Sequence, residues 1–118
     1  MKQILIVDDE PLVRRSLARL FQNGYHTIEA SDGLTGFQLW QKQSPDIVFL
    51  DVLMPGMTGP EILKELDPVL RSKAKVILIS AYTGGYNLES ARSIGADLFI
   101  AKPFEDIFAI KKIVEDLF

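Results

Sequence analysis

The sequence predicts an α/β domain with a doubly wound, five-stranded parallel sheet that carries helices on both faces. The first observation behind this prediction is an alternation, in which five short, β-branched apolar runs are separated by longer amphipathic stretches. The second is that most of the short runs are continuously apolar, as expected of strands covered on both faces. Five successive strand–helix units also favour parallel strands joined by right-handed crossovers.

The first two units are delimited by proline, glycine and capping residues. Strands are predicted at 3–7 and 26–30, and helices at roughly 11–27 and 32–43. Pro11 suits the first turn of a helix, and Gly24 suits a left-handed position after one. Ser31 or Asp32 can cap the second helix, which cannot continue through Pro45. Its inward stripe is predicted to comprise Leu34, Phe37 and Leu39 or Trp40.

The remaining three units repeat the pattern. Strands are predicted at 46–52, 75–80 and 98–101, and helices at roughly 59–72, 84–94 and 104–117. Gly95 suits the end of the fourth helix as Gly24 suits the end of the first. The inward stripe of the last helix is predicted to comprise Ile107, Ile110, Ile113, Val114 and Leu117.

Composition narrows the function classes. The 118 residues, 47% of them hydrophobic, suffice for one compact domain spanning 1–118. A net charge of −3 and scattered basic residues argue against direct binding to nucleic acid or to an anionic membrane. The absence of cysteine excludes disulfides, thiolate zinc sites and cysteine nucleophiles. No apolar run is long enough for a signal peptide or a membrane span, and we expect a cytoplasmic protein.

Acidic residues follow two of the predicted strands. Asp8 and Asp9 come directly after 3–7, and Asp51 lies at the end of the third apolar run. The carboxyl ends of parallel strands share one edge of the sheet, where open α/β folds bind ligands. Three carboxylates converging there would repel one another unless a cation joined them, and oxygen ligands of this kind suit Mg²⁺. The cluster therefore predicts a metal site that handles phosphate.

Two more strands end in polar residues. Ser80 ends the fourth apolar run and Lys102 follows the fifth, so four of the five strands present a polar group at the same edge. Taken alone, Asp8 and Asp9 could cap a helix, Ser80 could be an ordinary strand-end hydroxyl, and Lys102 could be solvated. Their combination with Asp51 favours a functional site.

In these residues the chain resembles the receiver domain of bacterial response regulators, the chemotaxis-type phospho-acceptor module of two-component signalling. The resemblance covers the whole chain, and the segments that carry it are 7–10 (VDDE), 51–59 (DVLMPGMTG), 79–81 (ISA) and 102–104 (KPF). It implies the flavodoxin-like fold, a doubly wound sheet with strand order 2-1-3-4-5.

The resemblance also implies a role for each site residue. Asp51 would be the phospho-acceptor, whose carboxylate takes a phosphoryl group from a phosphohistidine. Asp8, Asp9, Asp51 and the backbone carbonyl of Leu53 would hold Mg²⁺, with Mn²⁺ as a substitute. Lys102 would place its ammonium on a phosphoryl oxygen, and the Ser80 hydroxyl would donate to another. The module would catalyse only its own phosphorylation and dephosphorylation and would not be a turnover enzyme.

A switch and its partners follow from the same resemblance. Phe99 stands where the family has an aromatic residue that moves with Ser80, although it could equally be core. The output surface would comprise the fourth helix, the fifth strand and the last helix, including Tyr86 and Leu88. The donor would be a sensor histidine kinase or a histidine phosphotransfer protein that docks on the first helix near Val13 and Leu17. The output would be an unidentified protein target or phosphate relay, and the module a monomer or a weak phosphorylation-dependent dimer.

Two further expectations and two alternatives accompany this interpretation. The Lys102–Pro103 bond resembles a family site that is commonly cis. Leu53 and Tyr82 are bulky and not acidic at positions that govern water access, so we expect slow self-dephosphorylation. The main alternative, a magnesium-dependent phosphohydrolase similar to the haloacid dehalogenase family, requires an Asp-x-Asp after the first strand, whereas here the acids are adjacent. A nucleotide or flavin carrier would require a glycine-rich phosphate loop, which the chain lacks.

Overall fold

The computed structural model covers residues 1–118 and describes 1–81 and 86–118. The strands are β1 (Lys2–Val7), β2 (Tyr25–Ala30), β3 (Ile47–Asp51), β4 (Lys75–Ser80) and β5 (Leu98–Ala101). The helices are α1 (Pro11–Leu20), α2 (Gly33–Gln43), α3 (Gly59–Glu65), α4 (Pro68–Ser72), α5 (Leu88–Ser93) and α6 (Ile107–Glu115). The predicted alternation of strands and helices is confirmed.

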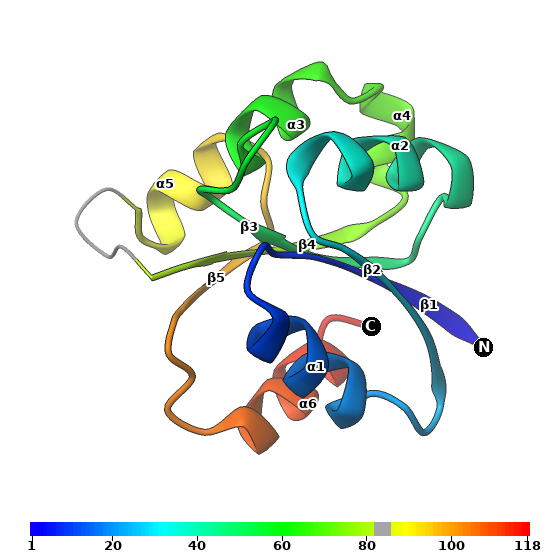
Figure 1. Ribbon diagram of the computed structural model, residues 1–118, viewed down its shortest axis with the longest axis vertical. Helices are drawn as coiled ribbons and strands as arrows, with labels where there is room; N and C mark the ends of the chain where they lie inside the picture. The colour runs from blue at the N-terminus through cyan, green and yellow to red at the C-terminus, as the bar shows by residue number, and fades with distance from the viewer. Residues whose placement is uncertain (82–85) are drawn as a thin grey trace.

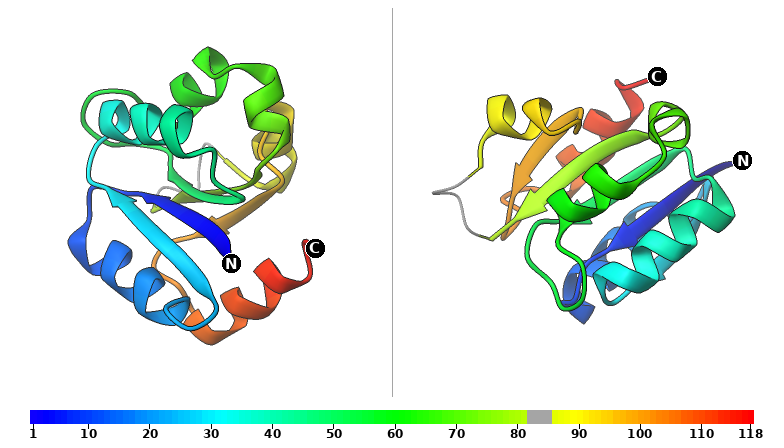
Figure 2. Two further views of the ribbon diagram at one scale, coloured as in Figure 1. Left: turned by 90° about the vertical axis from the view of Figure 1, so that its right-hand side faces the viewer. Right: turned by 90° about the horizontal axis from the view of Figure 1, so that it is seen from above.

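The five strands form one sheet in the order β2-β1-β3-β4-β5, and every pairing is parallel. Helices α1 and α6 lie side by side on one face, while α2, α3, α4 and α5 cover the other (Figure 1). Two further views show the twisted sheet between these two layers (Figure 2). The predicted fold class and strand order are both confirmed.

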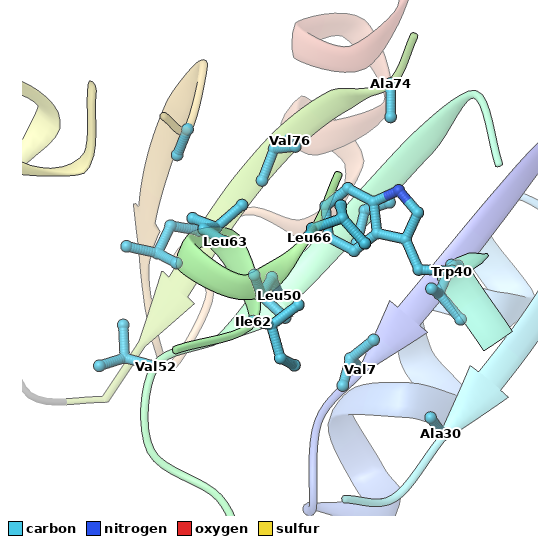
Figure 3. Close-up of a cluster of buried hydrophobic side chains, with 14 of the residues drawn as sticks. Val7, Ala30, Trp40, Leu50, Val52, Ile62, Leu63, Leu66, Ala74 and Val76 are labelled. Atoms are coloured by element: carbon cyan, nitrogen blue, oxygen red, sulfur yellow. The ribbon is translucent and has the colours of Figure 1, made fainter. Parts of the chain in front are cut away.

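Alternate residues of each central strand enter different hydrophobic clusters. The cluster on the α1 and α6 side contains Ile4, Ile6, Leu17, Phe21, Ile47, Phe49, Ile77, Ile79, Ile110 and Val114. The opposite cluster includes Val7, Trp40, Leu50, Ile62 and Val76, which point toward one another between the sheet and its helices (Figure 3). Because both faces are packed, the strand ends are the part of the sheet left open to a ligand.

The first helix was predicted to extend to residue 27, but α1 ends at Leu20. Phe21 leaves the helix with φ −103° and ψ 8°, and its amide bonds back to the carbonyl of Leu17. Gly24 then adopts φ +98°, which reverses the chain into β2. Pro11 occupies the first turn of α1, as predicted.

The predicted helix 59–72 is two helices. Asp67 lies before Pro68, and its backbone, with φ −54° and ψ 126°, is outside the helical region. This is the restriction that proline imposes on the residue before it. The Asp67 side chain then accepts a hydrogen bond from the Val69 amide and caps α4.

The last two helices begin after capping side chains, and the last one begins later than predicted. The predicted start of helix 84–94 falls outside the described residues; α5 begins after Asn87, whose side chain caps it. The last helix begins after Asp106, which accepts hydrogen bonds from the amides of Phe108 and Ala109. Gly95 follows α5 with φ +103°, as predicted.

Two predicted core positions are wrong. Leu34 is 51% exposed and Ile113 is 38% exposed. Helix α2 instead turns Gly36 and Trp40 toward the sheet, and a Cβ at Gly36 would lie 2.5 Å from the side chain of Val7. The helix packs too closely at that point for a larger side chain. The predicted cap is confirmed, since Asp32 accepts the Thr35 amide hydrogen bond.

Candidate functional site

The side chain of Lys102 joins three carboxylates from two parts of the chain. Its Nζ lies 3.0 Å from Asp8 Oδ2, 2.8 Å from Glu10 Oε1 and 3.4 Å from Asp51 Oδ1. Lys102 follows β5, Asp8 and Glu10 follow β1, and Asp51 is the last residue of β3. The carboxyl ends of these strands meet at one edge of the sheet. The Lys102 and Asp51 side chains are buried, and Asp8 is completely so. The structure thus brings together Asp8, Asp51 and Lys102 as the sequence predicts.

Asp8 is held from several sides. Its amide donates to the Ala30 carbonyl of the neighbouring β2, which continues the β1–β2 pairing past the end of the strand. Its Oδ1 accepts a hydrogen bond from the Glu10 amide at 2.8 Å, and its backbone carbonyl accepts one from Arg14 Nη1 at 2.8 Å. Arg14 also pairs with Glu29 of β2 at 3.4 Å. The carboxylate therefore has a fixed direction toward Lys102.

The loop after Asp51 is fixed at both ends. The Val52 amide donates to the Ile79 carbonyl, and the Gly59 amide donates back to the Val52 carbonyl. A Cβ at Gly59 would lie 2.4 Å from the Asp51 carbonyl oxygen, so the start of α3 lies directly against Asp51. Thr58 and Glu61 form a reciprocal capping box at that helix start. The predicted loop thus serves to position Asp51.

Burial and neighbouring charges shift the pKa values of the pocket. Burial, reinforced by the charge of Asp8, raises the pKa of Asp51 from 3.8 to about 7 despite the opposing effect of Lys102. Burial also raises the pKa of Asp8. For Lys102, burial alone would lower the pKa, but hydrogen bonds to Glu10 and Asp8 together with the charge of Asp51 raise it. The lysine therefore stays charged among carboxylates that repel one another.

Ser80 lies beside this pocket. It is buried at the end of β4, and its carbonyl accepts a hydrogen bond from the Lys102 amide at 2.9 Å. The Lys102–Pro103 peptide bond is cis, as the resemblance implied. Phe99, the predicted switch residue, is half-buried against the cluster that contains Trp40.

The oxygen groups of the pocket fit a hard divalent cation. One carboxylate oxygen from each of Asp8, Asp9 and Glu10 lies within 4.8 Å of the others. Asp9 and Glu10 are exposed while Asp8 is buried, so the group opens to solvent. An all-oxygen donor set of this kind suits Mg²⁺, which keeps several waters and binds through one or two carboxylates. Leu53, whose backbone carbonyl the resemblance names as a ligand, has a side chain that is 64% exposed.

Two contributors were not predicted as site residues. Glu10 makes the shortest contact to Lys102, and Arg14 orients the Asp8 backbone. The acid at position 10 directly follows the predicted pair, which is a signal for the first of them. The contacts of Arg14 depend on how α1 leaves β1, which no local pattern in the sequence predicts.

A groove of about 400 Å³ adjoins the pocket between α1 and the segment before α6. It is lined by Glu10, Leu12, Val13, Ser16, Ala81, Lys102, Pro103, Phe104 and Ile107. Leu12 is 72% exposed, whereas Leu17 is fully buried in the core. Leu17 therefore faces the sheet, whereas Val13, the other position near which a donor is expected to dock, lines the groove. Among the described residues, no helix is long and apolar enough to cross a membrane.

The fold and the pocket together define a doubly wound α/β domain with an acidic, lysine-bridged site at the carboxyl edge of its sheet. The family model of the response regulator receiver domain matches residues 4–115. The chain belongs to this family and is a receiver domain of the two-component type, a signalling module and not a classical enzyme.

Relatives and solved structures agree with this assignment. The chain is 38% identical over 115 residues to sporulation initiation phosphotransferase F of Bacillus subtilis, covering 97% of this chain and 91% of that protein. It is also 38% identical over 106 residues to the regulatory protein AtoC of Escherichia coli, but this covers 89% of the chain and only 23% of that protein. The chemotaxis response regulator CheY4 of Vibrio cholerae superposes with a TM-score of 0.87 at 26% identity, covering 100% and 99% of the two chains.

Proposed function

We propose that this chain, as a single receiver domain spanning 1–118, accepts a phosphoryl group on Asp51 from a phosphohistidine donor and changes its surface in response. The observation that supports the proposal is the placement of Lys102 within 3.4 Å of Asp51 and 3.0 Å of Asp8 in a buried pocket. A lysine ammonium so placed can neutralise an incoming phosphoryl oxygen as well as the carboxylates.

The transfer is a substitution at phosphorus. A carboxylate oxygen of Asp51 forms the new bond to phosphorus while the bond between phosphorus and the donor's imidazole nitrogen breaks. The electron pair of that bond stays on the imidazole nitrogen, and Asp51 becomes an acyl phosphate. The reaction needs the ionised carboxylate, whereas the raised pKa of Asp51 holds part of the population protonated near neutral pH.

The metal ion of this proposal is Mg²⁺ or, as a substitute, Mn²⁺. Asp8, Asp9, Asp51 and the Leu53 carbonyl would hold it, and Glu10 lies close enough to contribute. When bound, the ion supplies positive charge that lets two anions approach each other. Asp8 would then be stabilised in its ionised form, against the effect of burial that raises its pKa.

Lys102 and Ser80 would respond to the product. Lys102 would exchange a carboxylate contact for a phosphoryl oxygen, and the buried Ser80 hydroxyl would donate to a second oxygen. These contacts exist only in the phosphorylated state, which gives the two states the difference in interaction that a switch requires. Phe99 and the exposed Leu88 lie on the surface formed by α5, β5 and α6, which is the proposed output surface.

The partners belong to the same proposal. The donor is a sensor histidine kinase or a histidine phosphotransfer protein, and the groove beside Lys102 with the exposed Leu12 is the docking position we propose for it. The Bacillus relative is named a phosphotransferase and matches this chain over most of both lengths, which supports relay of the phosphoryl group. The module would work in the cytoplasm as a monomer or a weak dimer, without contacting nucleic acid or membrane.

Incubation with acetyl phosphate and Mg²⁺ followed by intact mass measurement tests the proposal. The native chain should gain the mass of one phosphoryl group, and Asp51→Asn should gain none. Asp116→Asn is the matched control, because this exposed carboxylate lies far along the chain at the end of α6 and should leave labelling unchanged. Labelling of Asp51→Asn to the native extent, or no labelling of the native chain, would refute the proposal.

A further inference from the structure

A second groove, which shares no lining residue with the carboxylate pocket, is lined by cations. It lies among α3, α4 and α5, which share one face of the sheet (Figure 1), and its volume is about 530 Å³. Its lining residues are Pro60, Lys64, Arg71, Arg92, Ser93, Ile94 and Gly95. The lining thus contains three positive side chains and no acidic one, in a protein whose net charge is −3.

The two arginines are held in place by backbone carbonyls. Arg71 donates from Nη1 to the Ile94 carbonyl, and Arg92 donates from Nε to the Asp97 carbonyl, each at 3.4 Å. A Cβ at Gly95 would lie 2.3 Å from Arg71 Nη1, so the guanidinium rests directly against that glycine. A guanidinium has five N–H donors, so a bond to one backbone carbonyl leaves further N–H groups that can bind a ligand.

Three acids on or beside these helices accept hydrogen bonds from backbone amides. Glu61 bonds to the Thr58 amide, Asp67 to the Val69 amide, and the Asp97 side chain to the Val76 amide. Within the described ranges, 1–81 and 86–118, Lys64, Arg71 and Arg92 have no carboxylate oxygen within 4.0 Å. The groove therefore concentrates positive charge that the protein's own side chains leave unpaired.

We propose that this groove binds a small organic molecule that carries a diphosphate group. Two phosphate groups bring roughly three to four negative charges, which is close to the charge of the three cations that line the groove. Guanidinium groups bind phosphate oxygens through paired, directional hydrogen bonds, whereas lysine contributes a point charge. Pro60 and Ile94 give the groove an apolar part beside the cations, which suits a ring attached to the diphosphate.

The proposal is independent of phosphorylation at Asp51. The groove draws its cations from α3, α4 and α5, while Lys102 is already saturated by three carboxylates. Binding is therefore best measured on the whole chain in buffer without divalent cations, where the carboxylate pocket repels phosphate. A protein that cannot be phosphorylated on Asp51 should therefore still bind the diphosphate, and a variant that cannot bind the diphosphate should still be phosphorylated.

Titration of the ¹⁵N-labelled chain with pyrophosphate and with ADP tests the inference. The amide signals of Lys64, Ile94 and Gly95 should shift in a saturable way, and ADP should bind more tightly than pyrophosphate. Arg71→Gln should weaken binding by about tenfold, the loss expected for one good charged contact. Arg15→Gln removes the same charge from an exposed position on α1 and should change affinity by less than about twofold.

Three results would overturn the inference. One is the absence of saturable shifts around the groove with either probe. Another is an equal loss of affinity in Arg71→Gln and Arg15→Gln, which would show attraction to net charge only. The third is binding of a hexaglutamate peptide at the same residues with higher affinity than ADP, which would identify an acidic protein segment as the ligand. Native-like amide spectra of both variants ensure that the comparison concerns binding and not folding.

Discussion

The positive charge of Lys102 offsets the repulsion between the buried carboxylates of Asp8 and Asp51. Removing the cation from a buried ion pair leaves an uncompensated charge, which usually destabilises a protein by about 3–5 kcal/mol. Lys102→Met should therefore lower the free energy of unfolding in metal-free buffer at pH 8 by about 3 kcal/mol. Urea denaturation measures the change. Asp51, whose pKa is about 7, can take up a proton at lower pH, so the loss should shrink at pH 5.

Lys112 provides the control for this substitution. Its ammonium lies 4.0 Å from Asp116, and both side chains are exposed. Ion pairs of this kind contribute about 0–1 kcal/mol. Lys112→Met should accordingly leave the unfolding free energy almost unchanged. A loss in Lys102→Met no greater than in this control would mean that the buried contacts contribute nothing to stability.

Asp51 gives the apo protein an unusual dependence on pH. Its pKa is about 7 in the folded chain and near 3.8 when unfolded. Between these values the folded state binds the extra proton, so stability falls as the pH rises through this window. The rise in the pKa of Asp51 from 3.8 to about 7 corresponds to about 4 kcal/mol of folding stability that is lost when the carboxyl ionises. Asp51→Asn removes this cost but also weakens the contact with Lys102, so it should be more stable than the native chain at pH 8 by about 2 kcal/mol. At pH 4, where Asp51 is protonated in the folded chain, the two proteins should differ little in stability.

Denaturation of both proteins across pH 4–8 without metal measures this effect. The same variant should show a smaller stabilisation by Mg²⁺, because one proposed ligand has lost its charge. An unchanged metal-induced shift in Asp51→Asn would contradict the proposed coordination. A native stability that rises steadily from pH 4 to pH 8 would contradict the pKa of about 7.

Leu53 bears on how long the acyl phosphate survives. Its side chain is 64% exposed in the loop after Asp51, while Tyr82, the other residue of this expectation, lies outside the described residues. A bulky apolar side chain cannot orient a water for attack on phosphorus. Leu53→Asn should therefore shorten the lifetime of the phosphorylated protein several-fold, as followed by intact mass over time. Val69→Asn, equally exposed on α4, should leave the lifetime unchanged.

At the scale of the element, the loop between β3 and α3 shows how glycine positions the acceptor. A methyl group at Gly59 would lie 2.4 Å from the Asp51 carbonyl oxygen, although α3 itself would tolerate alanine there. Gly59→Ala should displace the Asp51 backbone, lower stability by about 1–3 kcal/mol, and weaken Mg²⁺ binding. Calorimetric titration with Mg²⁺ provides the second readout.

Gly24 offers a comparison in which strain acts without a clash. It has φ +98°, and a Cβ there would meet nothing within 4 Å. Gly24→Ala should destabilise the chain by about 1 kcal/mol through backbone strain and leave Mg²⁺ affinity intact. Equal loss of Mg²⁺ affinity in both variants would show that Gly59 acts through general stability and not through the position of Asp51.

Element boundaries were harder to predict than element types. The apolar periodicity of 59–72 is continuous, yet Pro68 divides it because Asp67 cannot remain helical before proline. Helix α1 ends earlier than predicted because Phe21 is buried in the core. Tertiary packing, and not local helix propensity, therefore sets this boundary. Leu34 is exposed for a similar reason, since Gly36 lets α2 approach Val7 and sets which face points inward.

At the scale of the whole molecule, the site was predictable because parallel strands bring their carboxyl ends together. Asp8, Asp51, Ser80 and Lys102 lie at strand ends in the sequence, and the sheet order places them at one edge. Glu10 and Arg14 were not predicted as site residues because their contacts depend on the path of the chain from β1 into α1. The groove among α3, α4 and α5 was not predicted for the same reason, since its three cations come from different helices whose mutual packing no local sequence pattern predicts.

The two hydrophobic clusters share every central strand, so the domain should unfold as one unit. Trp40 reports the cluster on one face, and far-ultraviolet circular dichroism reports all the helices. Their urea transitions should coincide in midpoint and slope, as expected of a small two-state domain. Mg²⁺ at a hundred times its dissociation constant should raise the unfolding free energy by about 2.7 kcal/mol with both probes. Separate transitions, or a metal effect seen by only one probe, would show that the two faces of the sheet fold independently and that the chain is not one cooperative receiver domain.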